Sequence, residues 1–224
     1  MSETTGLDVM GLEEIEVENT AVDEIDSENV NLIFVGIDQS SSMDPYINDM
    51  IQSLTEFKTA IEDSKEADEI LVARASFNHA ITVGGYKKIT DFDTSYFSQG
   101  STALYDVICE GEKKLSDYIT FLKSQGMRVK AVFALFSDGE DTCSRQNAHN
   151  AKTAIKNLKD TEITTAFISF GGGATNIANA LGFANVLTVG SSATELRKAF
   201  NCLSKSVIES SKSVVGATDD FFVM

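Results

Sequence analysis

Tryptophan is absent from this chain of 224 residues, which contains one proline, two histidines and three cysteines. With so little proline the chain has no breaker-rich linker, and its length suits one domain with its own core. No stretch approaches the roughly 20 apolar residues of a membrane-spanning helix, and the first ten residues lack the basic and apolar parts of a secretory signal. The three cysteines lie far apart, which favours reduced thiols and predicts a cytoplasmic location.

Basic residues are missing from the first 30 positions, although acidic residues are frequent there. The whole chain has a formal net charge of −16. It should repel nucleic acids and anionic membrane surfaces, so we expect neither as a partner. Residues 1–29 are interpreted as an acidic, disordered tail, residues 30–211 as the domain, and residues 212–224 as a C-terminal tail. The last six residues of the chain, DDFFVM, leave two interpretations open. They are either a frayed end or a segment that presents a carboxylate to the metal of a neighbouring copy or docks on another subunit.

Long apolar runs over 31–37 and 129–136 each lead to an acidic residue. Such runs are typical of strands that are buried on both faces of a parallel sheet. Apolar periodicity and turn signals predict further strands over 69–78, 80–86, 162–172 and 185–190, and helices over 45–63, 102–123, 146–159, 174–182 and 192–211. This alternation predicts an α/β fold with a doubly wound, Rossmann-like, mainly parallel sheet and helices on both faces.

Polar side chains gather in three segments that follow strands or begin helices. Asp38, Ser40 and Ser42 follow the first buried strand, Asp138 follows the strand at 129–136, and Thr102 stands where a helix begins. In open α/β sheets, ligands bind beyond the carboxyl ends of the strands, so we expect these side chains to converge. Carboxylate and hydroxyl oxygens suit Mg²⁺, Mn²⁺ or Ca²⁺ rather than zinc or copper.

These segments resemble the metal-ion-dependent adhesion site of von Willebrand factor A (vWA) domains. The resemblance rests on Asp-x-Ser-x-Ser at 38–42, Thr102 in Gly-Ser-Thr-Ala-Leu and Asp138 in Ser-Asp-Gly, and it extends over about residues 30–211. It implies that the hydroxyls of Ser40, Ser42 and Thr102 contact a metal ion, and that Asp38 and Asp138 balance its charge. A Glu or Asp carboxylate of a partner protein would complete the shell. The implied function is metal-dependent protein binding, as an adaptor or assembly subunit.

Two alternatives belong to other classes. A buried strand that ends in Asp also begins the haloacid-dehalogenase phosphatases, but the position of their general acid is Ser40 here, and a serine hydroxyl has no useful pKa for that task. We therefore expect no enzyme. Standalone cytosolic vWA domains also resemble subunits of AAA+ ATPase complexes of the MoxR or chelatase kind, or of tellurite-resistance-like complexes. In such a complex the metal site would be structural.

Other conspicuous residues have plainer interpretations. Asp44 suits the acidic first turn of a helix, and Asp106 suits either that role or support of the metal site. Glu140 and Asp141 are expected at the rim, where they would influence the choice of partner. The Gly171-Gly172-Gly173 run lacks the Lys-Ser/Thr of a phosphate-binding loop, so it predicts a tight turn between a strand and a helix.

Overall fold

The computed structural model describes residues 19–64, 69–212 and 220–223. Strands and helices alternate along most of the chain, as the sequence pattern predicts. In chain order the elements are η1 (Val22–Glu24), β1 (Asn29–Asp38), η2 (Ser41–Tyr46), α2 (Ile47–Glu62), β2 (Glu69–Phe77), β3 (Ile81–Val83), β4 (Lys87–Lys88), η3 (Ile89–Asp91), α3 (Leu104–Ser124), β5 (Arg128–Ser137), α4 (Ala148–Asp160), β6 (Thr164–Phe170), α5 (Thr175–Leu181), β7 (Asn185–Val189) and α6 (Ala193–Lys212).

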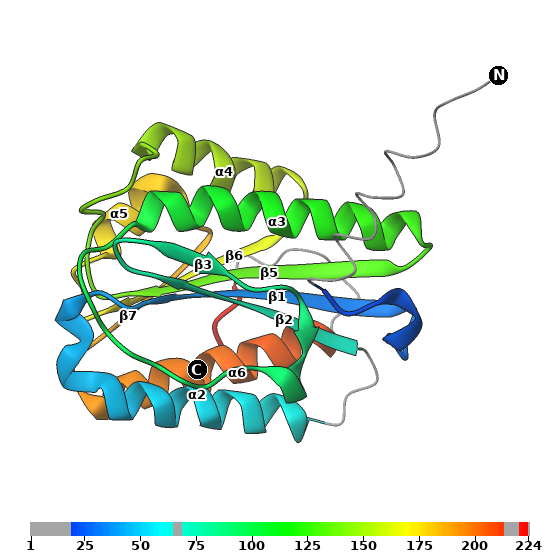
Figure 1. Cartoon of the computed structure of the whole chain (residues 1–224), viewed down its shortest axis with the longest axis horizontal. Coiled ribbons are helices and arrows are strands. Elements are labelled where there is room, and N and C mark those ends of the chain that lie inside the picture. Colours follow the sequence, from blue (N-terminus) through cyan, green and yellow to red (C-terminus); the bar gives the residue numbers. More distant parts are fainter. Residues whose placement is uncertain (1–18, 65–68, 213–219, 224) are drawn as a thin grey trace.

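Among the described residues, one sheet of seven strands forms the centre of the molecule (Figure 1). Its order is β3-β2-β1-β5-β6-β7, with β4 pairing to β2 as well. The five long strands are parallel, whereas β3 and β4 run antiparallel to β2. Because Ile37 of β1 pairs with Phe136 of β5, the two central strands end at the same level. The predicted doubly wound, mainly parallel α/β fold is confirmed.

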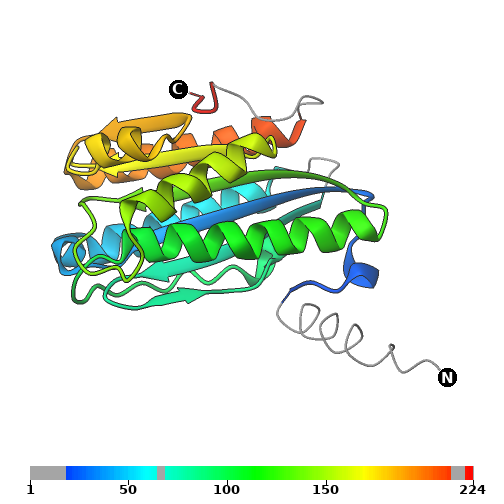
Figure 2. The same ribbon diagram turned by 90° about the horizontal axis from the view of Figure 1, so that it is seen from above.

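Helices cover both faces of the sheet, with α3, α4 and α5 on one side and α2 and α6 on the other (Figures 1 and 2). Both faces of β1 and β5 are therefore buried, and two apolar cores form. Helix α3 approaches the sheet closely at Gly111, where a Cβ atom would overlap the ring of Phe34. Phe34 stacks on Phe133 with ring centroids 4.6 Å apart. In the described part of the chain, no helix is both long and apolar enough to cross a membrane.

Segments outside the sheet and its helices also contact the domain. The hydroxyl of Tyr118 donates a hydrogen bond of 2.9 Å to the carbonyl of Thr20, and the partly buried Val22 and Ile25 pack against the core. Contacts therefore begin before residue 30, where the domain is predicted to start, whereas residues 1–18 of the predicted tail lie outside the described residues. At the other end, Phe221 is 3% exposed and packs into the core beside α6, so the described residues 220–223 dock on their own domain.

Candidate metal site at the carboxyl edge of the sheet

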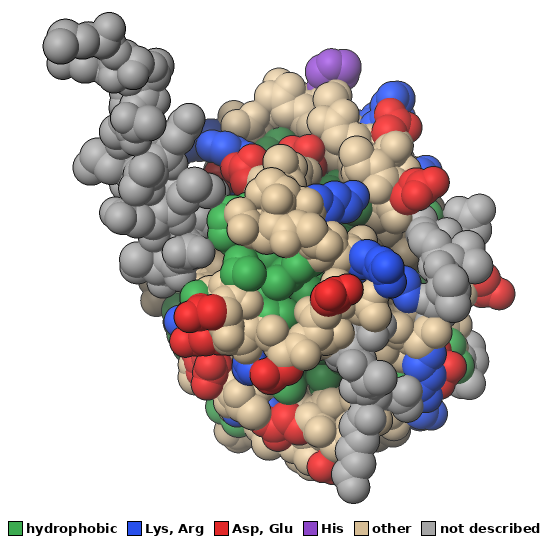
Figure 3. Space-filling model, turned by 90° about the vertical axis from the view of Figure 1, so that its right-hand side faces the viewer, with side chains coloured by type: hydrophobic (Ala, Val, Ile, Leu, Met, Phe, Trp, Pro, Cys, Tyr) green, Lys and Arg blue, Asp and Glu red, His purple; other side chains and the backbone are tan. Residues whose placement is uncertain are grey.

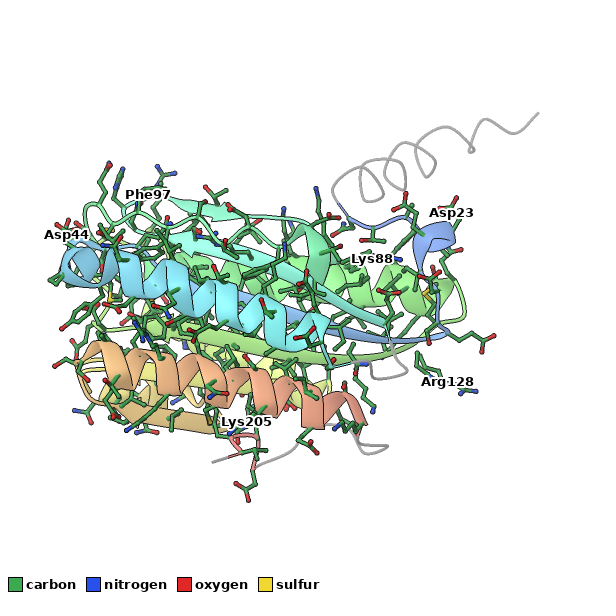
Figure 4. All side chains as sticks on the ribbon, turned by 90° about the horizontal axis from the view of Figure 1, so that it is seen from below. Asp23, Asp44, Lys88, Phe97, Arg128 and Lys205 are labelled. Carbon is green, nitrogen blue, oxygen red and sulfur yellow. The ribbon has the colours of Figure 1, made fainter. Side chains whose placement is uncertain are left out.

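The predicted site residues lie at the carboxyl edge of the sheet. Asp38 is the last residue of β1, Asp138 follows the last residue of β5, and Thr102 precedes the first residue of α3 by two positions. Asp44, in the η2 turn that begins just after Ser40, marks this end of the molecule in Figure 4. Neighbouring parallel strands bring segments that are far apart in the sequence to one edge.

Asp38 is completely buried, and three groups hold it in place. Its carboxylate accepts hydrogen bonds from the backbone N–H of Ser40 at 2.8 Å and from the Ser137 hydroxyl at 2.5 Å. Its backbone carbonyl accepts one from the Tyr96 hydroxyl at 2.6 Å. Burial raises the pKa of this carboxyl to about 6, the nearby charge of Asp138 adds to the rise, and the serine hydrogen bonds oppose it. A carboxylate whose charge is so poorly solvated would be stabilised by a cation.

Ser40, Ser42 and Asp138 form a continuous chain of contacts. The two serine hydroxyl oxygens lie 3.0 Å apart, and the Ser42 hydroxyl donates to the Asp138 carboxylate at 2.9 Å. Ser40 is buried, Ser42 is exposed and Asp138 is half-buried. This series of contacts therefore leads from the interior to the surface, where Ser42 and Asp138 are accessible to another molecule.

Thr102 is held between the other two segments by its backbone. Its N–H donates to the Thr142 hydroxyl at 2.8 Å and its carbonyl accepts from the Thr142 N–H at 2.9 Å. Just before it, the carbonyl of Gly100 accepts from the N–H of Ser41 at 3.0 Å. The Thr102 side chain is 5% exposed, and its hydroxyl makes no hydrogen bond to any residue that the structure describes. The predicted helix start at Thr102 is two residues too early. The Thr102 carbonyl accepts from Thr142, and the N–H of Asp106, which would bond to that carbonyl in a helix, donates to the Ser144 hydroxyl instead, so α3 begins at Leu104.

Two residues that support the site do not stand out in the sequence. Ser137 donates to Asp38 and also lies 3.1 Å from the carbonyl of Gly139, so it links the ends of β1 and β5. Gly173 lies against the backbone of Asp138 so closely that a Cβ atom there would overlap the Asp138 carbonyl oxygen. The glycine run at 171–173 does form a tight turn between β6 and α5, as predicted. Its last member has the further role of leaving space for Asp138.

The acidic residues around the site are used mainly in loop structure. Asp44 accepts a hydrogen bond from the Ser98 hydroxyl. Asp106 accepts from the backbone N–H groups of residues 145 and 146, and Asp141 accepts from the N–H of Tyr105 at 3.3 Å and from the Ser144 hydroxyl. Asp106 and Asp141 thus tie the loop after β5 to helix α3. Glu140 is exposed in the same loop.

The donor set fits a hard divalent cation. Among the described residues, there is no cluster of three or more His, Cys, Asp or Glu side chains of the kind that could hold a metal ion without other ligands. A cation at this edge would therefore depend on hydroxyl oxygens together with two carboxylates. The contact chain from Ser40 to Asp138 provides such oxygens at hydrogen-bond spacing, and the Thr102 hydroxyl has no described partner. Oxygen-only ligands are typical of Mg²⁺, Mn²⁺ and Ca²⁺ sites.

No protein-family model matches the chain, and no curated protein matches it. Solved structures do match. The pilus adhesin SpaC from Lactobacillus rhamnosus GG has a TM-score of 0.63 at 13% identity, over 82% of this chain and 30% of that one. A von Willebrand factor type A protein from Catenulispora acidiphila has a TM-score of 0.56 at 19% identity, over 81% and 43%. The vWF domain of the pili tip protein Mfa5 from Porphyromonas gingivalis has a TM-score of 0.57 at 13% identity, over 80% and 95%.

This chain has the vWA fold. Two of the three structures are von Willebrand factor domains, and each of these two likenesses covers at least 80% of this chain. At these identities the likeness concerns the fold alone. The chain spans less than half of SpaC and of the Catenulispora protein, so their activities as whole proteins do not transfer to it.

Proposed function

We propose that this chain is a protein-binding module that depends on a divalent cation, Mg²⁺ or alternatively Mn²⁺ or Ca²⁺. Asp38, Ser40, Ser42, Thr102 and Asp138 hold the ion, and a Glu or Asp carboxylate of a partner protein completes its shell. The observation that carries the proposal is the contact chain of two hydroxyls and one carboxylate that leads outward beside the buried Asp38.

The chemistry of the donors explains why a partner carboxylate is needed. When bound, the ion supplies a Lewis-acidic position, and neutral hydroxyl ligands leave its charge only partly balanced at the open side. Ser42 is exposed and Asp138 half-buried, so this side is accessible, whereas Asp38 and Ser40 are buried on the inner side. The partner thus meets a preformed, electron-poor position surrounded by loops of this chain.

The same contacts favour binding over catalysis. Among the described hydrogen bonds, the Ser40 and Ser42 hydroxyls contact each other and Asp138 but no histidine or lysine that would activate a nucleophile. The position of a phosphatase general acid is occupied by Ser40. Turnover of a phosphate ester in Mg²⁺ that disappears in an Asp38→Ala variant would contradict this part of the proposal.

The decisive experiment is a titration with Mg²⁺ and with Mn²⁺ by calorimetry on the full chain. Asp138→Ala removes a charge-balancing carboxylate from the surface end of the site, and we expect it to weaken metal binding by about 100-fold. Glu140→Ala is the matched control, because it removes an exposed carboxylate from the same loop. Its effect should stay within about twofold. Equal affinities in wild type and Asp138→Ala would refute the proposed ligand set.

A second experiment tests the dependence of partner binding on the metal. The immobilised wild-type chain and the Asp138→Ala variant are exposed to extract in Mg²⁺ or in EDTA, and captured proteins are identified. We expect a partner that is retained only by wild type in Mg²⁺. A AAA+ ATPase in that fraction would agree with the sequence-based alternative, whereas a partner retained equally in EDTA would show that the metal does not mediate the contact.

A further inference from the structure

A hollow of about 580 Å³ opens beside the candidate metal site. It is lined by residues of β2, by the turn at Gly84-Gly85 and by residues of the loop over 91–97. Gln39, the residue after Asp38, lines the same hollow. The volume lies in the range of protein ligand sites. None of the five candidate ligand residues lines the hollow, but Gln39 lies between two of them in the chain, which places the hollow next to the metal site.

Polar groups without partners line this hollow. The Gln39 side chain is 3% exposed, and among the described residues its amide has no hydrogen-bond partner. Both of its backbone groups are in use, since its N–H donates to the carbonyl of Phe77 at 2.7 Å and its carbonyl accepts from Gln99 at 2.6 Å. The amide atoms of Gln39 are not among the fully buried side-chain atoms that lack a partner, so they reach the solvent of the hollow. This side chain can therefore pair with a molecule that enters the hollow.

Arg74 adds a second such group. Its Nη1 donates to the backbone carbonyl of Asp93 at 2.6 Å and lies 3.3 Å from the Asp93 carboxylate. Its Nε is buried and has no partner. Asp91 and Asp93 balance the charges of Arg74 and Lys87 around the hollow. Balanced charge disfavours a phosphate or a polyanion as the occupant and favours a neutral polar group.

Phe97 supplies an apolar contact at the mouth. Its side chain is 56% exposed, more than the other exposed large hydrophobic residues of the described chain, Ile51 at 37% and Val223 at 40%. Figure 4 shows Phe97 and Asp44 at the same end of the molecule. An exposed aromatic ring beside a polar hollow is typical of a surface that binds another molecule.

We propose that this hollow binds the stretch of partner polypeptide next to the carboxylate that reaches the metal ion. The Gln39 amide has one donor and one acceptor side, which match the acceptor and donor of a main-chain peptide group. An apolar side chain of the same stretch packs on Phe97. Since Gln39 follows Asp38 directly, and an extended chain advances about 3.3 Å per residue, a few residues span both anchors. The proposal rests on the metal-dependent binding proposed above and gives it sequence preference: an acidic residue with an apolar residue close by.

The test uses a display library of short, linear random peptides selected on the full chain in Mg²⁺. We expect enriched peptides to share an acidic residue and an apolar residue at constant spacing. An enriched peptide is then titrated against variants. Phe97→Ala removes the apolar contact and Gln39→Met removes both polar sides of the amide at similar volume. Each should weaken peptide binding by about tenfold while Mg²⁺ affinity stays unchanged.

Val223→Ala is the matched control, because it removes an exposed apolar side chain far from the site, and it should leave peptide binding unchanged. The proposal is overturned if no peptide is enriched, or if enriched peptides bind the Phe97→Ala and Gln39→Met variants as well as wild type. Glycans bound in place of peptides, and lost in Phe97→Ala, would overturn it in favour of a sugar. Peptides that depend on Phe97 although calorimetry detects no Mg²⁺ binding would support the hollow and refute the metal-dependent function.

Discussion

The two ends of the sheet differ in the chemistry of their surfaces. At the carboxyl end, Asp38, Ser40 and Thr102 are buried polar residues around a candidate cation site. At the amino end, a smaller hollow of about 260 Å³ has Ile119, Val129, Ala131 and Ile163 among its lining residues, with lysines at 123 and 130. Figure 3 faces this end and shows a hydrophobic patch among charged side chains.

This difference follows from the direction of the strands. In a parallel sheet each strand leads into a helix at its carboxyl end, so the loops and helix N-termini gather there. The amino end receives helix C-termini and short returns such as 125–127. The same fold therefore provides one end suited to ligand chemistry and one end that is mainly structural. The predictions below test that division, from the largest expected effect to the smallest.

The largest effect should come from the C-terminal segment near the amino end. Phe221 is buried, and its N–H donates to the side-chain oxygen of Asn185 at the start of β7 at 2.9 Å. Phe221→Ala should lower the free energy of unfolding by about 3 kcal/mol, measured by denaturant titration, and leave Mg²⁺ affinity unchanged. Phe222→Ala, which removes a partly buried ring, should cost less. If Phe221→Ala leaves stability unchanged, the segment is not docked.

The second effect concerns the buried charge of Asp38. Asp38→Asn keeps the shape of the side chain and removes the charge, so it should raise the free energy of unfolding in EDTA at pH 7 by up to about 3 kcal/mol. The same variant should bind Mg²⁺ much more weakly. This opposite response of stability and binding is expected at the carboxyl end only.

The pH dependence gives an independent check on Asp38. Its folded-state pKa, raised by burial to about 6, lies above the unfolded value of 3.8. Below pH 3.8 the carboxyl is protonated in both states and costs nothing. As the pH rises from about 4 to about 6, the wild type loses stability relative to the variant, and above this range the difference stays constant. The advantage of Asp38→Asn should therefore vanish at pH 4, and an advantage of equal size at pH 4 and pH 7 would contradict this explanation.

The third effect concerns the close contact between Gly173 and the backbone of Asp138. Gly173→Ala places a Cβ atom against the carbonyl of Asp138, so the loop must shift, and Mg²⁺ affinity should fall by about tenfold. Gly139→Ala is the control, because no atom lies within 4 Å of a Cβ built there. Calorimetry on both variants measures the difference. Equal affinities would mean that the position of Asp138 is not held by this contact.

The smallest effect is expected for Lys130→Ala in the amino-end hollow. Lys130 lies at the opposite end of β5 from the metal site. This separation exceeds the Debye length, so dissolved salt screens the interaction between the Lys130 charge and the metal site. Mg²⁺ affinity should change by less than about twofold, and the free energy of unfolding by less than about 0.5 kcal/mol. A change of several-fold in Mg²⁺ affinity would show that the two ends are coupled after all.

Much of this architecture could be predicted because it depends on local patterns. The buried runs at 31–37 and 129–136 fall in β1 and β5, and the helical periods fall in α2 through α6. The carboxyl ends of these strands bring Asp38 and Asp138 to one edge, as predicted. Whether these residues bind a metal, whether the protein works in the cytoplasm and whether its partner is a AAA+ ATPase stay predictions.

The sequence by itself determined the fold class and the position of the candidate site, since both follow from apolar periodicity and from residues at strand ends. Only the tertiary structure decided which distant groups support that site: Ser137 and Tyr96 on Asp38, and Gly173 behind Asp138. It also decided that Phe221 is buried and that Gln39 and Phe97 line one hollow. Such contacts join residues that share no local pattern, because packing across the sheet depends on shape and not on spacing along the chain.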